Sequence, residues 1–135
     1  MTYYWDSSAV VNAVVSQSVK DRLEQGEHWT RRHTFAELFS VLTGRGIFAS
    51  GSIVRLSASD VFAIIQDLAP KFKIVELDLR ETIEGYEQAG RRGVQGGRIH
   101  DYEHALACDK AKADIFLTRD QHDFKELTRA DIQKP

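Results

Sequence analysis

Short apolar runs of strand type alternate along this chain with longer segments of helical periodicity, and this alternation is the feature that most restricts its fold. The runs "TYYW" (2–5), "KIVEL" (73–77) and "DIFLT" (114–118) combine aromatic and β-branched residues, and 28–33 is a further, weaker strand candidate. Strands separated in this way by helices are typical of parallel sheets. The pattern therefore predicts an α/β fold with a mainly parallel sheet flanked by helices.

The segments between these runs carry apolar residues at three- and four-residue spacings. Helices are predicted from Ser7 onward and over the ranges 18–25, 34–43, 57–69, 79–89 and 99–111. Three other stretches have the composition of connections: "GRGIFASGS" (44–52) as a loop, "GRRGVQGGR" (90–98) as a basic glycine-rich connector and "RDQHDF" (119–124) as a turn. At 135 residues the chain fits a single domain spanning 1–135.

The cysteine content and the hydropathy pattern favour a cytoplasmic protein. The single cysteine, Cys108, excludes an internal disulfide framework and fits a reducing compartment. No apolar run reaches the roughly 20 residues that a membrane-spanning helix needs. We therefore expect a cytoplasmic domain without a membrane segment.

Five acidic residues lie at the ends of predicted strands or near the starts of predicted helices. They are Asp6, Glu37, Asp101, Asp120 and Asp123. In open α/β sheets, ligands bind in the crevice beyond the carboxyl ends of the strands. Asp6 ends the first strand, and Asp120 and Asp123 follow the last one, so these acids are placed where that rule predicts chemistry.

Each acid also has an ordinary structural role. Asp6 is a suitable helix N-cap, although Ser7 or Ser8 would cap equally well. Thr34 and Glu37 fit a capping box, in which the glutamate bonds back to the cap residue. An acid at the position of Asp101 complements the helix macrodipole, and aspartates in the segment 119–124 favour turns. Taken singly, none of these residues identifies a functional site.

Taken together, the acids point to a cation. Carboxylates held close together repel one another, and without a cation some of them take up protons. Mg²⁺ and Mn²⁺ are hard ions that prefer carboxylate and water oxygens. An acidic site built only from oxygen ligands is typical of metal-assisted phosphoryl transfer.

With this pattern, the sequence resembles the PIN-domain ribonucleases, and specifically the VapC-type toxins of type II toxin–antitoxin systems. The resemblance covers essentially the whole chain. It is carried by the opening strand with "DSSAVVNA", by "HTFAELFSVL" and by "GRIHDYEHALACDKAKADIFLTRDQHDF". It implies a PIN-like domain with a central sheet of about five strands, and divalent-metal-dependent hydrolysis of RNA.

Carried over by position, the resemblance implies that Asp6, Glu37, Asp101 and Asp120 line an acidic pocket, with Asp123 as a fifth catalytic acid. Asp6 and Asp101 are the implied metal ligands, and Mg²⁺ or Mn²⁺ is the implied cofactor. Glu37 or Asp120 orients or deprotonates the attacking water, and the residues themselves do not decide between the two. The expected products carry 5′-phosphate and 3′-hydroxyl ends.

Attraction for RNA must come from local features, because the formal net charge is only −2. Arg91, Arg92 and Arg98 flank glycines just before Asp101 and are candidates to contact RNA phosphates. Further candidates of the same kind are Arg31, Arg32, His33 and Arg119. The resemblance also implies that Thr118 helps to orient the loop after the last strand or a ligand water. His100 and His104 have a spacing that suits zinc, but no third ligand is evident, which disfavours a zinc site.

Two partners besides RNA are implied by the resemblance: a cognate antitoxin protein and a second copy of the chain in a homodimer. The predicted helices 34–43 and 57–69 carry many bulky apolar residues, most of which we expect to pack in the core. Any excess over the needs of a small core would form an exposed groove for an apolar segment of the antitoxin. Two alternative functions stay open. The first is a PIN-scaffold binding module without activity. The second is a PIN nuclease that acts in RNA processing outside a toxin pair.

Overall fold

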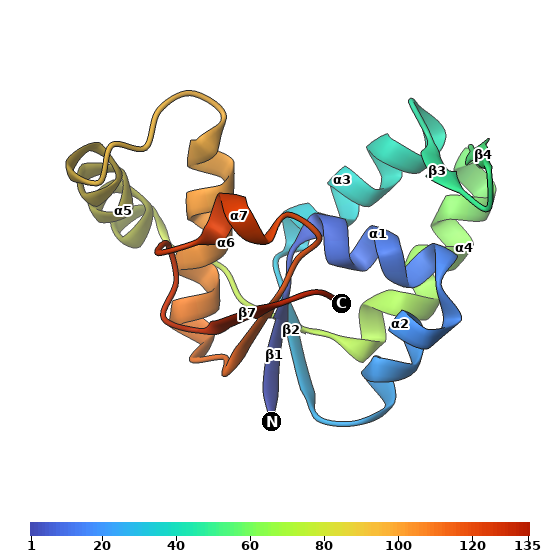
Figure 1. The fold of residues 1–135 in the computed structure, drawn as a ribbon, viewed down its shortest axis with the longest axis horizontal. Coiled ribbons are helices and arrows are strands. Elements are labelled where there is room, and N and C mark those ends of the chain that lie inside the picture. The colour runs from blue at the N-terminus through green and yellow to red at the C-terminus, as the bar shows by residue number, and fades with distance from the viewer.

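A computed structural model describes residues 1–135 and shows a sheet of five parallel strands, in the order β5-β2-β1-β6-β7 (Figure 1). The strands are β1 (Thr2–Trp5), β2 (Glu27–Thr30), β5 (Lys73–Ile74), β6 (Ile115–Leu117) and β7 (Asp131–Gln133). A separate antiparallel hairpin is formed by β3 (Ile47–Ala49) and β4 (Ser52–Val54). The predicted parallel α/β architecture is confirmed.

Helices lie on both sides of the sheet (Figure 1). On one side are α1 (Ser7–Val15), α2 (Gln17–Asp21), α3 (Arg32–Thr43) and α4 (Ala58–Leu68), with short 3-10 turns at Arg22–Glu24 and Ala69–Lys71. On the other side are α5 (Leu79–Arg91), α6 (Arg98–Ala111) and α7 (Gln121–Phe124). The carboxyl ends of the central strands therefore open between two sets of helices.

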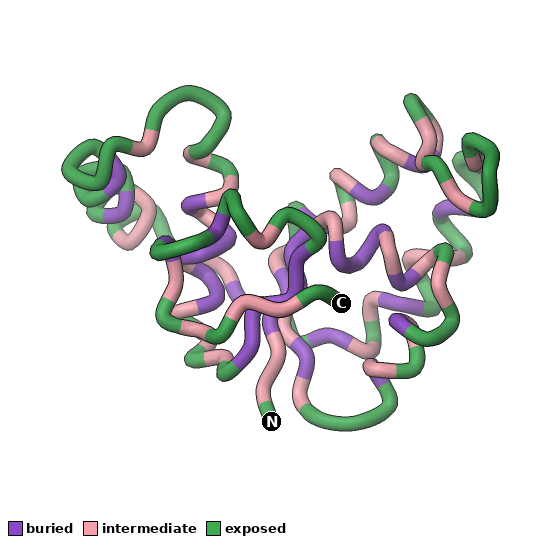
Figure 2. Tube along the Cα trace, viewed as in Figure 1, coloured by how far each residue is buried: buried purple, intermediate pink, exposed green.

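The side chains of the central strands alternate between two apolar clusters, as the two-residue period of a strand requires. Trp5 and Leu117 pack with α1, α3 and α4, whereas Tyr4 and Phe116 pack with α6 and α7. Figure 2 shows the buried residues gathered along these strands and along the helices beside them. The aromatic opening run is thus used on both faces, which fixes the position of the residue that follows it.

Several predicted boundaries are wrong. The segment 44–52 contains β3 and the start of β4 rather than a loop, and the strand predicted over 28–33 ends at Thr30 because Arg32 already begins α3. Strand β7 has no counterpart in the sequence-based prediction. It is a three-residue edge strand, and the pairing of Phe116 with Ile132 that defines it is a tertiary contact without a local pattern.

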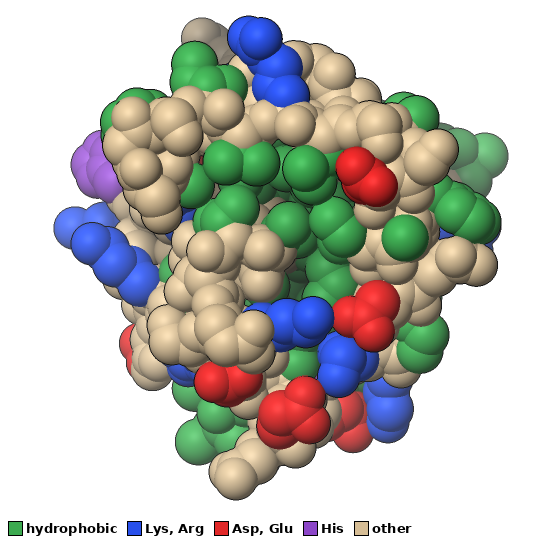
Figure 3. All heavy atoms as spheres, turned by 90° about the vertical axis from the view of Figure 1, so that its right-hand side faces the viewer, with side chains coloured by type: hydrophobic (Ala, Val, Ile, Leu, Met, Phe, Trp, Pro, Cys, Tyr) green, Lys and Arg blue, Asp and Glu red, His purple; other side chains and the backbone are tan.

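One outer face of the molecule is hollowed and apolar. Figure 3 shows hydrophobic side chains gathered around a hollow on the side that carries α2, α4 and the hairpin. A groove of about 260 Å³ between α1, α2 and α4 is lined mainly by apolar residues: Ala13, Val14, Ala63, Ile64 and Leu68. Lys20 and Asp67 form an ion pair of 3.1 Å at its edge. None of the helices has the length and apolar character that crossing a membrane requires.

Candidate active site

A polar pocket of about 290 Å³ opens at the carboxyl ends of β1 and β6. Its lining includes four of the five predicted acids, which come from four separate parts of the chain: Asp6, Glu37, Asp101 and Asp120. The other polar lining residues are Ser7, Ser8, Arg45, His100, His104 and Arg119. Residues up to 114 positions apart in the sequence therefore meet in one pocket, as the strand-end rule predicted.

Strand register places Asp6 in this pocket. Trp5 pairs with Leu117, so the next residues along the two parallel strands, Asp6 and Thr118, lie side by side. The fully buried Thr118 hydroxyl donates to Asp6 Oδ2 at 2.6 Å. It also accepts a hydrogen bond of 3.0 Å from the Asp120 backbone N–H, so Thr118 orients both Asp6 and the loop after β6.

Asp6 is also the N-cap of α1, which decides between the three capping residues that the sequence offered. Asp6 Oδ1 accepts hydrogen bonds from the Ala9 backbone N–H at 2.9 Å and from the Ser8 hydroxyl at 2.7 Å. Burial raises the pKa of Asp6, while His104 and the hydrogen bonds from Thr118, Ala9 and Ser8 oppose that rise. The capping and functional interpretations of Asp6 are thus compatible, because both use the same carboxylate.

Glu37 does not form the predicted capping box. Helix α3 begins at Arg32, so Thr34 lies inside the helix with its hydroxyl 2.9 Å from that of Thr30. The first backbone N–H of α3, at Arg32, is instead satisfied by Glu76 Oε1 at 2.7 Å. Glu76 lies 44 residues away in the sequence, so no local pattern reveals this contact. Glu37 is therefore free to face the pocket.

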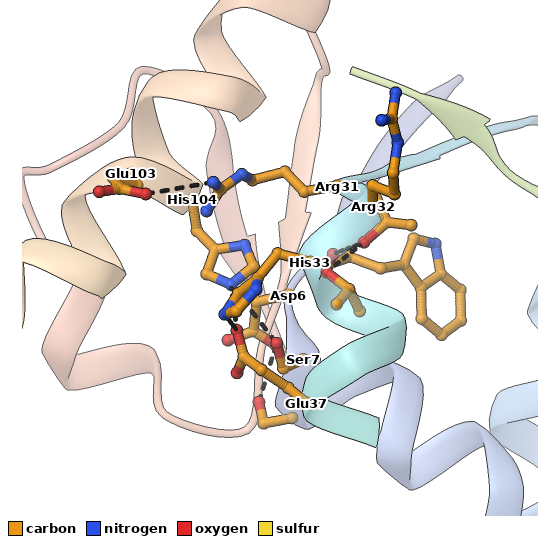
Figure 4. A network of polar contacts seen from close by, with 12 residues as sticks. Asp6, Ser7, Arg31, Arg32, His33, Glu37, Glu103 and His104 are labelled. Carbon is orange, nitrogen blue, oxygen red and sulfur yellow. Dashed lines mark hydrogen bonds and ion pairs between the residues drawn. The ribbon is translucent and has the colours of Figure 1, made fainter. Parts of the chain in front are cut away.

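Two imidazoles and a hydroxyl surround Glu37 (Figure 4). His33 Nε2 lies 3.2 Å and His104 Nε2 lies 3.8 Å from Glu37 Oε1. Burial raises the pKa of Glu37, but His104, the Ser7 hydroxyl and the charge of His33 outweigh it and hold the pKa to about 2. Glu37 is consequently ionised at neutral pH and is a weak base.

Asp101 lies in the first turn of α6, and its electrostatic environment is the reverse of that of Glu37. Burial and the nearby negative charges of Asp123 and Asp6 raise its pKa, against the opposing charges of His104 and Arg98. The pocket therefore concentrates negative charge around Asp101. Asp123 takes part in this charge interaction from α7 but does not line the pocket.

Of the arginines that the sequence suggested as RNA contacts, only Arg119 lines the pocket, and it is joined there by Arg45, which the sequence did not suggest. Arg45, which follows α3, and Arg119, which follows β6, are both lining residues. Arg91, Arg92 and Arg98 are not. Arg91 pairs with Glu87 on its own helix, and Arg92 and Arg98 contact the backbone carbonyl oxygens of Glu126 and Asp123 at 3.4 Å.

Sequence reasoning also missed His104 and Arg45 as pocket residues. His104 was weighed only as half of a zinc pair with His100, and both histidines instead line the acidic pocket. The position of His104, three residues after Asp101 on one helix face, was the available signal. Arg45 gave none, because its segment was predicted to be a loop.

Comparisons with known proteins bear on the fold. No protein-family model matches the chain, and no curated protein matches it. Among solved structures, that of VapBC-1 from nontypeable Haemophilus influenzae matches over 99% of this chain and 98% of that chain, with a TM-score of 0.67 and 16% sequence identity.

The chain has a PIN-like fold. At 16% identity the match shows a shared fold and no more. The order of the five parallel strands and the helices on both sides of the sheet are the features of this chain that constitute its PIN-like fold.

The donor chemistry of the acidic pocket suits a hard divalent cation, although no group of three or more His, Cys, Asp or Glu side chains is arranged to hold a metal ion. Mg²⁺ usually binds proteins through one or two carboxylates and keeps several waters. Asp6 accepts hydrogen bonds from Ser8, Ala9 and Thr118, which leaves about one of its four lone-pair positions free. A divalent cation that is held by two carboxylates and keeps several bound waters is therefore the arrangement that fits this pocket.

The raised pKa of Asp101 gives a stability prediction. Its folded-state pKa lies above the ordinary 3.8, so ionisation of Asp101 destabilises the fold once the pH exceeds that ordinary value. We expect Asp101→Asn to raise the free energy of unfolding at pH 7 in EDTA, by less than about 1 kcal/mol because solvent screens a half-exposed charge. At pH 3 the difference disappears. Urea unfolding at both pH values measures it.

Asp67→Asn is the matched control, because Asp67 is exposed and already paired with Lys20. It is expected to give no stabilisation at either pH. An Asp101→Asn variant that is less stable than the parent protein at pH 7 contradicts the charge-repulsion account.

Proposed function

We propose that residues 1–135 form one PIN-like nuclease domain that hydrolyses RNA phosphodiester bonds with a divalent cation, as the cytoplasmic toxin of a toxin–antitoxin pair. The observation that carries this proposal is the meeting of Asp6, Glu37, Asp101 and Asp120 in one pocket at the carboxyl ends of parallel strands. The fold shared with VapBC-1 and the sequence resemblance to VapC-type toxins support the same function.

In this proposal Asp6 and Asp101 hold Mg²⁺ or Mn²⁺, which supplies positive charge against the phosphate and lowers the pKa of water at the site. Glu37 orients the attacking water rather than deprotonating it, since a carboxylate with a pKa of about 2 is a poor proton acceptor at neutral pH. We assign the proton-accepting role to Asp120, which also lines the pocket. Asp123 adds negative charge next to Asp101.

In this proposal RNA runs along two hollows that adjoin the acidic pocket. One hollow shares Glu37, Val41 and Arg45 with the pocket, and the other shares Arg119 and includes Lys134. Each hollow thus contains an arginine that also lines the pocket. We propose that Arg45 and Arg119 contact the phosphates that flank the cleaved bond. Arg98 does not line the pocket, and its positive charge acts to lower the pKa of Asp101. Local cations of this kind offset the net charge of −2.

The proposed partners use other surfaces. The apolar groove between α1, α2 and α4 is the site we assign to an apolar segment of the antitoxin (Figure 3). Exposed Phe39 and Phe62 on α3 and α4 extend the hydrophobic surface available to such a segment. A homodimer is the proposed assembly, by resemblance to the VapC-type toxins.

The test of the proposed activity compares the parent protein with Asp6→Asn and Asp101→Asn on a single-stranded RNA in MnCl₂. Each variant is expected to lose activity by about 100-fold or more, because each removes a negative charge placed for catalysis. EDTA abolishes cleavage by the parent protein, and added Mn²⁺ restores it. Asparagine at position 6 keeps an N-cap for α1, so loss of fold does not account for the effect.

Asp67→Asn serves as the control with unchanged cleavage. Full activity in both Asp6→Asn and Asp101→Asn contradicts the assignment of the site. Folded parent protein that cleaves no RNA in Mn²⁺, and whose melting temperature does not change with Mn²⁺, favours a binding module without activity.

The RNA path has its own test, measured as binding of a fluorescent single-stranded RNA to the Asp101→Asn protein in EDTA. Arg45→Ala and Arg119→Ala in that background are expected to weaken binding and to reduce the slope of log affinity against log salt by about 0.7 each, the value for one phosphate contact on a single strand. Arg80→Ala, on the exposed face of α5, is the control without effect. An unchanged salt slope in both pocket variants contradicts this path.

A further inference from the structure

A buried polar pair joins the acidic pocket to the interior of the protein, and the proposed chemistry gives its inner member, Tyr4, no role. The Tyr4 hydroxyl on β1 lies 2.7 Å from His104 Nδ1 on α6, and both side chains are buried. Their rings meet edge to face, with centroids 5.9 Å apart. Burying two polar side chains is unfavourable unless they are satisfied, and an apolar pair would fill the same space without that cost. The pair therefore calls for a functional explanation.

Tyr4 fixes which nitrogen of His104 carries a proton. Burial raises the pKa of Tyr4 well above its usual value, so the hydroxyl keeps its proton. The Tyr4 hydroxyl has no hydrogen-bond partner besides His104 Nδ1, so we infer that it donates its proton there, and a neutral imidazole then carries its hydrogen on Nε2. When the imidazole is cationic, Nδ1 donates to the Tyr4 oxygen and Nε2 again carries a hydrogen. In both charge states, Nε2–H is the group that His104 presents to the pocket.

The neighbours of His104 Nε2 are pocket residues that come from the opposite set of helices. His104 Nε2 lies 3.4 Å from the Ser7 hydroxyl and 3.8 Å from Glu37 Oε1 (Figure 4). At 3.8 Å the contact with Glu37 is electrostatic, and an N–H facing an ionised carboxylate is favourable whereas a bare ring nitrogen would repel it. Glu37 comes from α3 and His104 from α6, so the contact crosses the pocket between the two sets of helices.

We propose that Tyr4 and His104 are positioning residues that orient Glu37 in the pocket, with Tyr4 holding His104 in the state that offers Nε2–H to Glu37. This inference rests on the proposed function, in which Glu37 orients water for RNA cleavage. Neither Tyr4 nor His104 contacts RNA in this scheme, and both act through Glu37.

His33 cannot take this role, although its Nε2 is closer to Glu37 Oε1, at 3.2 Å. It lies four residues before Glu37 on the same helix, so it moves with Glu37 and does not fix it relative to α6. It is also exposed and has no buried partner that sets its protonation state. His104 is anchored to β1 through Tyr4, which makes it a fixed reference point in the pocket.

The kinetic test uses Tyr4→Phe, which removes the hydroxyl and keeps the ring stacked on Phe116. We expect kcat for RNA cleavage to fall by about 10-fold with KM unchanged, since loss of a group that orients an active-site side chain typically has effects of this size. Tyr86→Phe is the matched control. It removes a tyrosine hydroxyl that is bonded to Glu103 on α6, the helix that carries His104, and neither Tyr86 nor Glu103 lines the pocket. It leaves kcat unchanged.

Substitutions of His104 separate orientation from packing. His104→Gln keeps an N–H donor near Glu37 and is expected to retain more activity than His104→Leu, which fills the space without a donor. Equal activity in these two variants, or parental kcat in Tyr4→Phe, overturns the proposal.

A second readout does not depend on RNA cleavage. Side-chain ¹⁵N NMR of the free protein reports which nitrogen of His104 is protonated, and we expect hydrogen on Nε2 in the parent protein and a tautomer mixture in Tyr4→Phe. A bare Nε2 in the parent protein overturns the proposal, even if Tyr4→Phe fails to fold. If the parent protein shows the expected spectrum and cleaves no RNA, the proposed function fails while the hydrogen-bonded pair stands.

Discussion

The parallel pairing of β1 with β6 is the constraint on which the site depends. It places Asp6 beside Thr118 at the ends of the two central strands, where the threonine hydroxyl and the N-terminus of α1 both bond to one carboxylate. The aromatic side chains of β1 make this register strict, because Tyr4 and Trp5 enter different apolar clusters. A shift by one residue would exchange their faces and move the carboxylate out of the pocket. The same strand register therefore determines both the core packing of Tyr4 and Trp5 and the position of Asp6 in the pocket.

The pocket concentrates like charge at some expense to the fold. Asp6 and Asp101 both have raised pKa values, whereas Glu37 is held to about 2 by its imidazole and hydroxyl neighbours. The acids thus fall into two electrostatic classes within one pocket. Asp6 and Asp101 lack enough positive neighbours and therefore suit the binding of a cation. Glu37 has such neighbours and suits the role of a fixed, ionised hydrogen-bond acceptor. Sites in which environments separate the pKa values of nearby acids are typical of enzymes.

The sequence predicted those features that local patterns control. The helix that starts at Ser7, the helix predicted over 57–69 and the strands around "TYYW" and "DIFLT" follow from local sequence patterns, and the strand-end rule brought the acids together. The misses depend on contacts between distant residues. Glu76 satisfies the start of α3 in place of a capping box, and β7 exists only by pairing with β6. The roles of Arg45 and His104 depend on which helices face each other across the pocket, and a single sequence carries no local record of that.

The central claim is that Asp6 and Asp101 share a divalent cation. Crystals grown with MnCl₂ test it most directly through the anomalous scattering of manganese. The account predicts an anomalous peak in the pocket, within coordination distance of one carboxylate oxygen from each of these two residues. A pocket without manganese density, or manganese bound only elsewhere on the molecule, would contradict it.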